Sequence, residues 1–313
     1  MENDKIKSVA LIGAGAIGSV VSRAVMSRPD VSFCLLAEGE RRERLMRDGL
    51  VVNGERLRPK VLTPQEAQNI DLIVVATKYP ALPAAVDAVA AVAGPQTTVL
   101  SLLNGIDSED IIARRIGSAR VLDSVTIVQG QRKDGEVVFN ADVDQVIFIG
   151  ERDSSEVTPR MRRLCDLFEG TCVSCVPRTD IRHDQWVKYS LNIIHNLPQA
   201  FLGVGFGAYA DSSYVAGIRD ALYAEIRQVA AAVGVTLDER IRTPPFAADV
   251  RFSTLQDLDA HRHTEIGMFV GALIRIAAER NVAIPICEFV YLIIRALEEK
   301  GDGRFSYQGN KGK

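Results

Sequence analysis

The chain has 313 residues, and its 47% of hydrophobic and 25% of charged residues are typical of a globular protein. This length suits about two domains with a sizeable core. The formal net charge of −3 gives no electrostatic reason to expect binding to nucleic acid or to a membrane surface. No apolar run reaches the roughly 20 residues that a membrane-spanning helix needs. With no charge signal for nucleic acid or a membrane surface, a small molecule is the expected ligand.

The first half of the chain alternates short apolar runs with helical segments. The expected strands are 8–13, 31–37, 71–77, 97–103, 119–128 and 145–150. The expected helices between them are 17–28, 40–48, 81–93 and 107–116. Such alternation is typical of a parallel sheet that is covered by helices on both faces. Residues 1–178 are therefore predicted to form a doubly wound, Rossmann-type dinucleotide-binding α/β domain.

A glycine-rich turn follows the first predicted strand and opens the first predicted helix. The sequence "GAGAIG" has the G-x-G-x-x-G spacing, in which glycines permit a tight turn, close approach to a pyrophosphate, and close helix packing. The phosphates are expected at the N-terminus of the helix. The loop residues expected to bind the cofactor are Gly13, Ala14, Gly15, Ala16, Ile17 and Gly18.

The choice of dinucleotide is expected to depend on Glu38, which ends the second predicted strand. A carboxylate at this place accepts the adenosine ribose hydroxyls and repels a 2′-phosphate. NAD(H) is therefore favoured over NADP(H). Arg41 and Arg42 could attract the phosphate, although they also fit the solvated first turn of a helix.

Strand signals end near residue 178, after a short apolar strand in "TCVSCVP" and a helix that Thr158 and Pro159 are expected to begin. The expected helices beyond this point are 183–201, 212–233, 253–280 and 286–299. Residues 179–313 are therefore predicted to form an all-helical domain. Its polar, glycine-rich end, 301–313, is expected to be frayed.

One of these helices has a polar line within an apolar surface. In "WVKYSLNIIHN" (186–196), Lys188, Asn192, His195 and Asn196 share one face and have apolar neighbours on both sides. A buried neutral polar group without a partner costs roughly 2–7 kcal/mol, and a charge costs more. Some partner must therefore satisfy these side chains. The alternative is that Lys188 reaches solvent from the edge of the helix.

Cysteines and histidines give no sign of a disulfide framework or a metal site. Five cysteines without framework spacing fit a reducing compartment, so the protein is expected to be cytoplasmic. Cys172 and Cys175 form C-x-x-C without a second pair, and structural thiols are favoured over a redox or zinc role. His261 and His263 are two residues apart on a predicted helix and face different sides, so no metal is expected.

Four stretches, in order along the chain, resemble the ketopantoate reductase (2-dehydropantoate 2-reductase) family. They are "GAGAIG" at 13–18, "TKYP" to "LLNGID" at 77–107, "WVKYSLNIIHN" at 186–196 and "STLQDLDAHRHTEI" at 253–266. The resemblance implies a Rossmann domain joined to a helical domain, with the active site in the cleft between them. It also implies NAD(P)H-dependent reduction of ketopantoate to pantoate, a step of pantothenate biosynthesis.

The resemblance also implies roles for particular residues, with Lys188 as the general acid and Glu265 assisting near the lysine and the cofactor. The residues that it assigns to the substrate are Lys188, Asn192, Asn196 and Ser253. The residues that it assigns to the cofactor are Lys78, Asn104 and Glu265. The chemistry agrees, because ketone reduction needs a hydride donor, a proton donor and groups that fix the neighbouring carboxylate.

Several positions leave alternatives open. Glu38 and Phe206 stand where relatives can have an arginine and a substrate-contacting asparagine. His195 either lines the cleft and shares in proton transfer or is a structural histidine, and the second interpretation is favoured. Ser253 and Gln256 also fit a capping box that would open a long helix.

The leading hypothesis is a reductase that acts on a small-molecule 2-oxo acid, ketopantoate. One rival is a related dehydrogenase for another 2-oxo acid or an opine-like substrate. The other is a dinucleotide sensor without catalytic activity. Monomer and homodimer both remain open, although the helical face at 212–233 could pair two subunits.

Overall fold

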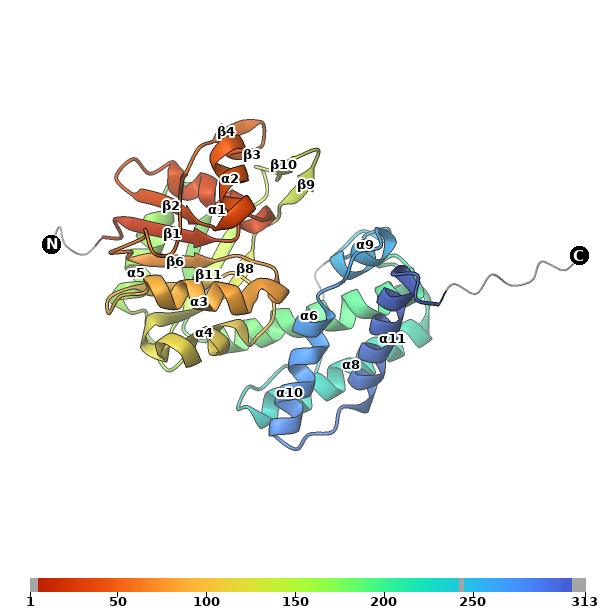
Figure 1. The fold of residues 1–313 in the computed structure, drawn as a ribbon. Helices are drawn as coiled ribbons and strands as arrows, with labels where there is room; N and C mark the ends of the chain where they lie inside the picture. The colour runs from red at the N-terminus through yellow and green to blue at the C-terminus, as the bar shows by residue number, and fades with distance from the viewer. Residues whose placement is uncertain (1–4, 242–244, 306–313) are drawn as a thin grey trace, which may run out of the picture. The chain divides into compact units, whose positions relative to one another are not determined.

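A sheet of eight strands organises the first part of the chain in the computed structural model, which describes residues 5–241 and 245–305 (Figure 1). Its strand order is β12-β11-β8-β7-β6-β1-β2-β5. The strands are β1 (Ser8–Ile12), β2 (Ser32–Leu36), β5 (Lys60–Leu62), β6 (Leu72–Val75), β7 (Thr98–Ser101), β8 (Val121–Ile127), β11 (Val146–Gly150) and β12 (Ser174–Pro177). From β5 to β8 all pairs are parallel, and β11 runs antiparallel to β8. The six parallel strands have the order of a Rossmann fold, as predicted.

Helices cover both faces of this sheet, because successive residues of a strand point to opposite sides. Val9 and Leu11 of β1 pack with α1 (Ala16–Met26) and α5 (Pro159–Phe168). Ala10 and Ile12 pack on the other face with α3 (Leu82–Val92) and α4 (Ser108–Ile116). The remaining helical segments of this part are α2 (Gly39–Asp48) and the short turns η2 (Tyr79–Ala81) and η3 (Ser118–Arg120). The two-sided burial explains why the strands are apolar at nearly every position.

A second, smaller sheet was missing from the sequence prediction. It contains β3 (Leu50–Val52), β4 (Glu55–Leu57), β9 (Gln131–Lys133) and β10 (Glu136–Val138), in the order β4-β3-β10-β9. Asn53-Gly54 and Asp134-Gly135 form its two hairpin turns, and all four residues have positive φ angles of 47°, 75°, 49° and 89°. Such dipeptides are the common sequence signal for a tight hairpin.

The rest of the chain is helical, as predicted. The chain forms two compact units, and the boundary between them falls between Gln185 and Trp186. This boundary lies within α6 (Ile181–Leu202), after the expected limit at residue 178. The other helices are α7 (Ala208–Asp211), α8 (Ser213–Ala232), α9 (Ser253–Asp259), a π-helical turn η4 (Gly267–Gly271), α10 (Ala272–Glu279) and α11 (Pro285–Gly301). Within 5–241 and 245–305, no helix is long and apolar enough to cross a membrane.

Two expectations for this helical part were wrong. The helix predicted over 253–280 is broken after Asp259, where His261 adopts a φ of +50°. Residues 301–305 are not simply a frayed end, because α11 continues to Gly301 and the Asp302 carboxylate lies 3.0 Å from Nε2 of His263. Residues 306–313 of the expected tail lie outside the described residues.

Candidate functional site

The glycine loop lies at the carboxyl end of β1, beside the end of β6. Gly13 has a φ of +104°, and a Cβ atom there would lie 2.6 Å from the backbone of Ala76 and Thr77. Only glycine allows this close approach. The parallel pairs Ile12 with Val75 and Val75 with Ser101 bring the ends of β1, β6 and β7 to one edge of the sheet. The strand order reverses between β1 and β6, which is where such sheets bind their ligands.

The same loop leads directly into the N-terminus of α1. Gly15 is the N-cap residue, no side chain caps the helix, and no acidic residue lies in its first turn. A Cβ atom at Gly18 would lie 2.0 Å from the Gly13 carbonyl oxygen, so helix and loop touch at this point. At Gly15 the nearest atom is 3.9 Å away, which leaves space above the helix N-terminus. This cradle fits a pyrophosphate, since the helix end offers free N–H groups and partial positive charge.

Charged side chains of both signs lie at the start of α2, the helix that follows β2. Glu38 is exposed at the N-cap of α2, just beyond the end of β2, as the sequence predicted. Arg42 is occupied by a two-pronged pair with Glu66, with both N–O distances at 3.0 Å. Arg41 instead lines a hollow of about 630 Å³ together with Ala14 of the glycine loop and Arg132 of β9. Burial lowers the pKa of the Arg41 guanidinium, and the nearby charges of Arg44 and Arg132 add to this effect.

The hairpin of β9 and β10 was not connected with this site in the sequence-based prediction. Arg132 donates a hydrogen bond of 2.9 Å to the carbonyl oxygen of Ala14, so the small sheet supports the glycine loop directly. The Asp134-Gly135 turn was the available signal for the hairpin. Nothing in the spacing showed that it would reach residue 14.

Lys78 and Asn104 follow β6 and β7 at this same edge of the sheet. Lys78 is exposed and precedes η2, and Asn104 is half-buried after β7. The Tyr79 hydroxyl donates a 2.6 Å hydrogen bond to the Asp107 carboxylate, which ties the two loops together. The Thr77 hydroxyl is buried and has no hydrogen-bond partner within the described part of the chain. An unsatisfied hydroxyl beside the glycine loop fits a polar group of a bound cofactor.

The polar line of the second unit lies on α6, as predicted. Lys188 and Asn192 are half-buried, Asn196 is 6% exposed, and the residues between them are largely apolar and buried. Lys188 and Asn196 are about 12 Å apart along the helix axis at 1.5 Å per residue. The line is one turn longer than predicted, because the fully buried Gln199 lies eleven residues after Lys188 on the same face.

Gln199 connects α6 to the segment before Ser253. Its amide donates to the Val250 carbonyl oxygen and its side-chain oxygen accepts from the Phe252 amide, both at 3.0 Å. Ser253 is exposed and is the first residue of α9. The expected capping box is wrong, since Phe252 is the N-cap residue, no side chain caps the helix, and the Gln256 amide donates to the Arg251 carbonyl. The Ser253 hydroxyl is thus not used as a helix cap.

Glu265 lies half-buried just before the π-helical turn, outside the long helix that was expected to contain it. Its carbonyl oxygen accepts from the amides of Met268 and Phe269 at 3.0 and 3.1 Å. The Tyr189 hydroxyl donates to the Phe269 carbonyl, so α6 and this turn are joined one residue after Lys188. This contact places Lys188 and Glu265 on adjoining segments of the second unit.

His195 is buried in aromatic surroundings. Its ring centroid lies 5.4 Å from that of Phe206 and 5.4 Å from that of Tyr209, and Nδ1 lies 3.1 Å from the Leu191 carbonyl oxygen. Burial lowers the pKa of His195 to about 4, so the ring is neutral near pH 7. This environment favours the structural role over a share in proton transfer.

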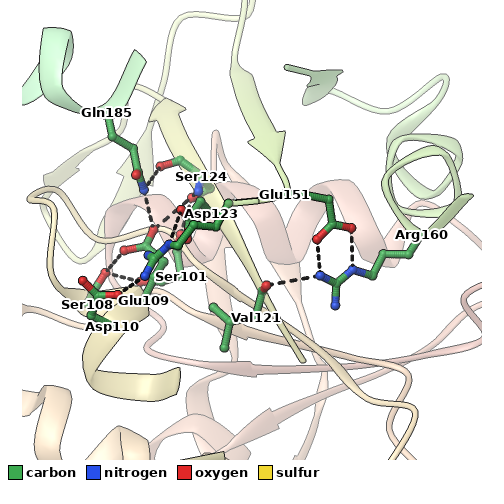
Figure 2. A network of polar contacts seen from close by, with 11 residues as sticks. Ser101, Ser108, Glu109, Asp110, Val121, Asp123, Ser124, Glu151, Arg160 and Gln185 are labelled. Carbon is green, nitrogen blue, oxygen red and sulfur yellow. Dashed lines mark hydrogen bonds and ion pairs between the residues drawn. The ribbon is translucent and has the colours of Figure 1, made fainter. Parts of the chain in front are cut away.

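A buried acidic network occupies the first unit next to the start of α6 (Figure 2). Glu109 of α4 is 2% exposed, accepts from the Ser108 hydroxyl at 2.7 Å, and accepts from the Gln185 amide at 3.1 Å. Gln185 also donates to the Ser124 carbonyl oxygen at 3.2 Å. These bonds hold the first turn of α6 to α4 and β8, a role for α4 that was not predicted.

Glu109 is the acid of this network that its surroundings favour in the protonated form below about pH 8. Asp123 has a two-pronged pair with Arg152, at 3.0 and 2.9 Å, which stabilises its charge although burial raises its pKa. Burial, and then the charge of Asp123, raise the pKa of Glu109 to about 8. The folded protein therefore holds a proton that the unfolded chain releases above its ordinary pKa of 4.5.

We expect Glu109→Gln to flatten the pH dependence of stability. As the pH rises from 4.5 to about 8, the wild-type free energy of unfolding should fall by up to about 1.4 kcal/mol per pH unit. The reason is that in this range the folded state binds a proton that the unfolded state does not. An amide keeps the size and the hydrogen bonds but does not titrate. Urea unfolding at several pH values measures this, with the exposed Glu40→Gln as the control. If the free energy of unfolding depends on pH equally in the wild type and in Glu109→Gln, the raised pKa of Glu109 is contradicted.

Thiols and metal ligands form no further site here. All five cysteines are free, and the sulfur atoms of Cys165 and Cys175 are 3.0 Å apart, so Cys175 neighbours α5 rather than Cys172. His263 pairs with acids instead of with His261. No group of three or more metal-ligating side chains occurs among the residues that the structure describes.

Comparison with known proteins matches both halves of the chain to one family. The profile described as ketopantoate reductase PanE/ApbA matches residues 9–154, and the profile of its C-terminal domain matches residues 180–298. The 2-dehydropantoate 2-reductase of Archaeoglobus fulgidus is 27% identical over 301 residues, which cover 94% of this chain and 99% of that protein.

Solved structures agree on the fold. A D-mandelate dehydrogenase, solved with NADH and anilino(oxo)acetate, superposes with a TM-score of 0.81 at 23% identity, covering 94% of this chain and 99% of that one. The 2-dehydropantoate 2-reductase of Methylococcus capsulatus gives a TM-score of 0.79 at 23% identity, covering 97% and 100% of the two chains. At this identity the likeness shows the fold alone.

Proposed function

The chain belongs to the ketopantoate reductase family of NAD(P)-dependent oxidoreductases, which act on a CH–OH group, and we propose that it reduces ketopantoate to pantoate. The observation that carries this proposal is the polar line of α6, where Lys188, Asn192 and Asn196 lie on one face of a largely buried helix. An amine with two amides supplies a proton donor and uncharged hydrogen-bonding groups for a 2-oxo acid. The glycine cradle supports the proposal from the cofactor side.

The proposed chemistry assigns one task to each polar group. A bound reduced nicotinamide supplies the hydride to the ketone carbon. As the electron pair of the carbonyl bond moves to oxygen, the Lys188 ammonium donates the proton that completes the hydroxyl group. Asn192 and Asn196 hold the substrate, and Ser253 binds its carboxylate. Glu265 assists in positioning the lysine and in restoring its proton.

The test is direct. Purified protein is mixed with ketopantoate and either NADH or NADPH, and the loss of absorbance of the reduced nicotinamide is followed. The proposal expects turnover that depends on ketopantoate. Failure to oxidise either cofactor in the presence of ketopantoate would overturn it.

NADH is the proposed preferred cofactor, because Glu38 is exposed just beyond β2 and a carboxylate at this place can accept the adenosine ribose hydroxyls. We expect Glu38→Arg to raise the ratio of kcat/KM for NADPH to that for NADH by roughly tenfold or more, since removing a close like charge is worth about 1–3 kcal/mol. Steady-state kinetics with both cofactors measures this ratio. Glu40→Arg, two residues further on, is the matched control. If this ratio of kcat/KM values is unchanged, the ribose must be contacted by Arg41 and its neighbours instead of by Glu38.

A second candidate is reduction of another 2-oxo acid. Phe206 supports it, because this phenyl group stands where relatives can have an asparagine that contacts the substrate. One solved structure with the same fold is a D-mandelate dehydrogenase with NADH and anilino(oxo)acetate. A panel of 2-oxo acids separates the two candidates.

We also propose a cytoplasmic location, because all five cysteines are free, which fits a reducing compartment. Monomer and homodimer both remain compatible with the proposal.

A further inference from the structure

Three phenylalanines gather beside the residues assigned to the substrate. Phe206 follows α6, and Phe246 and Phe252 precede α9. The centroid of Phe246 lies 5.1 Å from those of both Phe206 and Phe252, which are 5.9 Å from each other. All three pairs are T-shaped, a favoured arrangement for aromatic rings. We name Phe206, Phe246 and Phe252 the phenyl cluster.

The backbone holds the two segments of the phenyl cluster together. The Phe206 amide donates to the Val250 carbonyl at 3.0 Å, and the Gly207 amide donates to the Ala248 carbonyl at 2.9 Å. A Cβ atom at Gly205 would lie 2.5 Å from the Ala248 carbonyl oxygen, so the chain segments approach as closely as glycine permits. The phenyl cluster is therefore a fixed surface and not a chance contact of loose side chains.

The layer beneath the phenyl cluster is closed and uncharged. The neutral ring of His195 contacts Phe206 and Phe252, with centroids 5.4 and 6.5 Å apart. The Tyr209 hydroxyl donates to the His195 carbonyl at 2.7 Å and lies 3.2 Å from the Ile194 carbonyl. The Ile194 carbonyl lacks its usual helical donor because Pro198 has no amide hydrogen. Tyr209 thus stabilises the proline turn of α6 under the cluster.

The upper side of the phenyl cluster remains accessible. Phe246 is 40% exposed, and Phe206 and Phe252 are half-buried. The cluster also lies at the end of the polar line of α6, since the Phe252 amide donates to the Gln199 side-chain oxygen at 3.0 Å and Ser253 directly follows Phe252. A 2-oxo acid held by Asn196 and Ser253 would present its substituent near these rings.

The chemistry of the phenyl cluster selects for a particular substituent. A phenyl ring at Phe206 cannot hydrogen-bond, so a substrate hydroxyl placed against it loses its water without gaining a partner. An aryl group gains from burial and from edge-to-face contact with these rings.

We propose that the phenyl cluster is a subsite for an aryl substituent, so that the protein reduces aryl 2-oxo acids at least as well as ketopantoate, with Phe206 as the residue that determines this specificity. The proposal rests on the proposed function, because it names the substrate class of the same site. The reaction is the same two-electron reduction, with a hydride to the ketone carbon and a proton to its oxygen.

The test compares phenylglyoxylate with ketopantoate as substrates. Phe206→Asn should lower the ratio of kcat/KM for phenylglyoxylate to that for ketopantoate by roughly 10–100-fold. Phe206→Leu, which stays apolar but loses the ring, should lower it by less. The exposed Phe289→Leu of α11 is the control and should change neither value. Melting temperatures show whether each variant is folded, and Phe246→Leu replaces any Phe206 variant that is not.

The outcomes separate this inference from the proposed function. Reduction of ketopantoate with no reduction of phenylglyoxylate, or an equal fall for both substrates in Phe206→Asn, would overturn the inference and leave the function intact. If no 2-oxo acid is reduced, the function fails. In that case, calorimetric titration of the wild type and Phe206→Asn with phenylglyoxylate tests the aryl subsite directly. Equal binding by the two proteins, or binding by neither, would overturn the inference.

Discussion

We expect Lys188→Ala to lower kcat by roughly 10²–10⁴-fold while the protein stays folded, since this is the usual contribution of a general acid. Lys188 is half-buried on α6, and its loss removes the proton donor proposed for the developing hydroxyl group. Steady-state kinetics with the preferred 2-oxo acid measures the effect, and circular dichroism and melting temperature check the fold.

Lys188→Arg separates charge from proton transfer. A guanidinium keeps the positive charge but does not release its proton near neutral pH, so this variant should remain at least tenfold slower than the wild type. The exposed Lys300→Ala of α11 serves as the control for loss of a lysine in the same unit. Wild-type turnover in Lys188→Ala would remove Lys188 from the mechanism, and full activity of Lys188→Arg would reduce its role to electrostatics.

The second large effect is expected in the glycine loop, where replacing either of two glycines by alanine should weaken cofactor binding, but for different reasons. In Gly18→Ala the new methyl group would meet the Gly13 carbonyl oxygen at 2.0 Å, so helix or loop must shift. Such overpacking costs about 1–3 kcal/mol or more, and we expect both a lower melting temperature and lost cofactor binding.

In Gly15→Ala the methyl group has space, with 3.9 Å to the nearest atom. This variant should keep its melting temperature and bind NADH at least tenfold more weakly, because the methyl group occupies the expected pyrophosphate space.

Calorimetric titration with NADH and thermal unfolding measure the two properties separately. Gly217→Ala is the control, because Gly217 lies within α8 with no atom within 4 Å of the new methyl group. Alanine there should leave stability equal or slightly higher. Normal NADH binding by Gly15→Ala would exclude the pyrophosphate from the cradle.

The Rossmann order of the sheet could be predicted because its signals are local and repeated. Apolar runs alternate with helices, and the glycine loop follows the first strand with the required spacing. The polar line of α6 was equally readable, since helical periodicity places Lys188, Asn192 and Asn196 on one face. These features depend only on residues that are close in sequence.

Features that depend on distant residues were missed. Asn53-Gly54 and Asp134-Gly135 mark two hairpins, but their union into one sheet and the contact of Arg132 with Ala14 join segments far apart in the chain. The break at His261 was missed because periodicity over 253–280 continues on both sides of it. Glu109 was taken as part of an ordinary helix start, and only its tertiary neighbours show that it is buried and protonated.

The boundary between the two units lies inside α6, after its first turn. Domains are usually joined by exposed linkers, which proteases cut and which genetic recombination can use as joints. Here a cut at the boundary would divide a continuous helix three residues before Lys188. Exchange of a whole second unit between relatives would therefore disrupt the helix that carries Lys188. New properties of the second unit should therefore arise by single replacements around a retained α6 more readily than by exchange of whole modules.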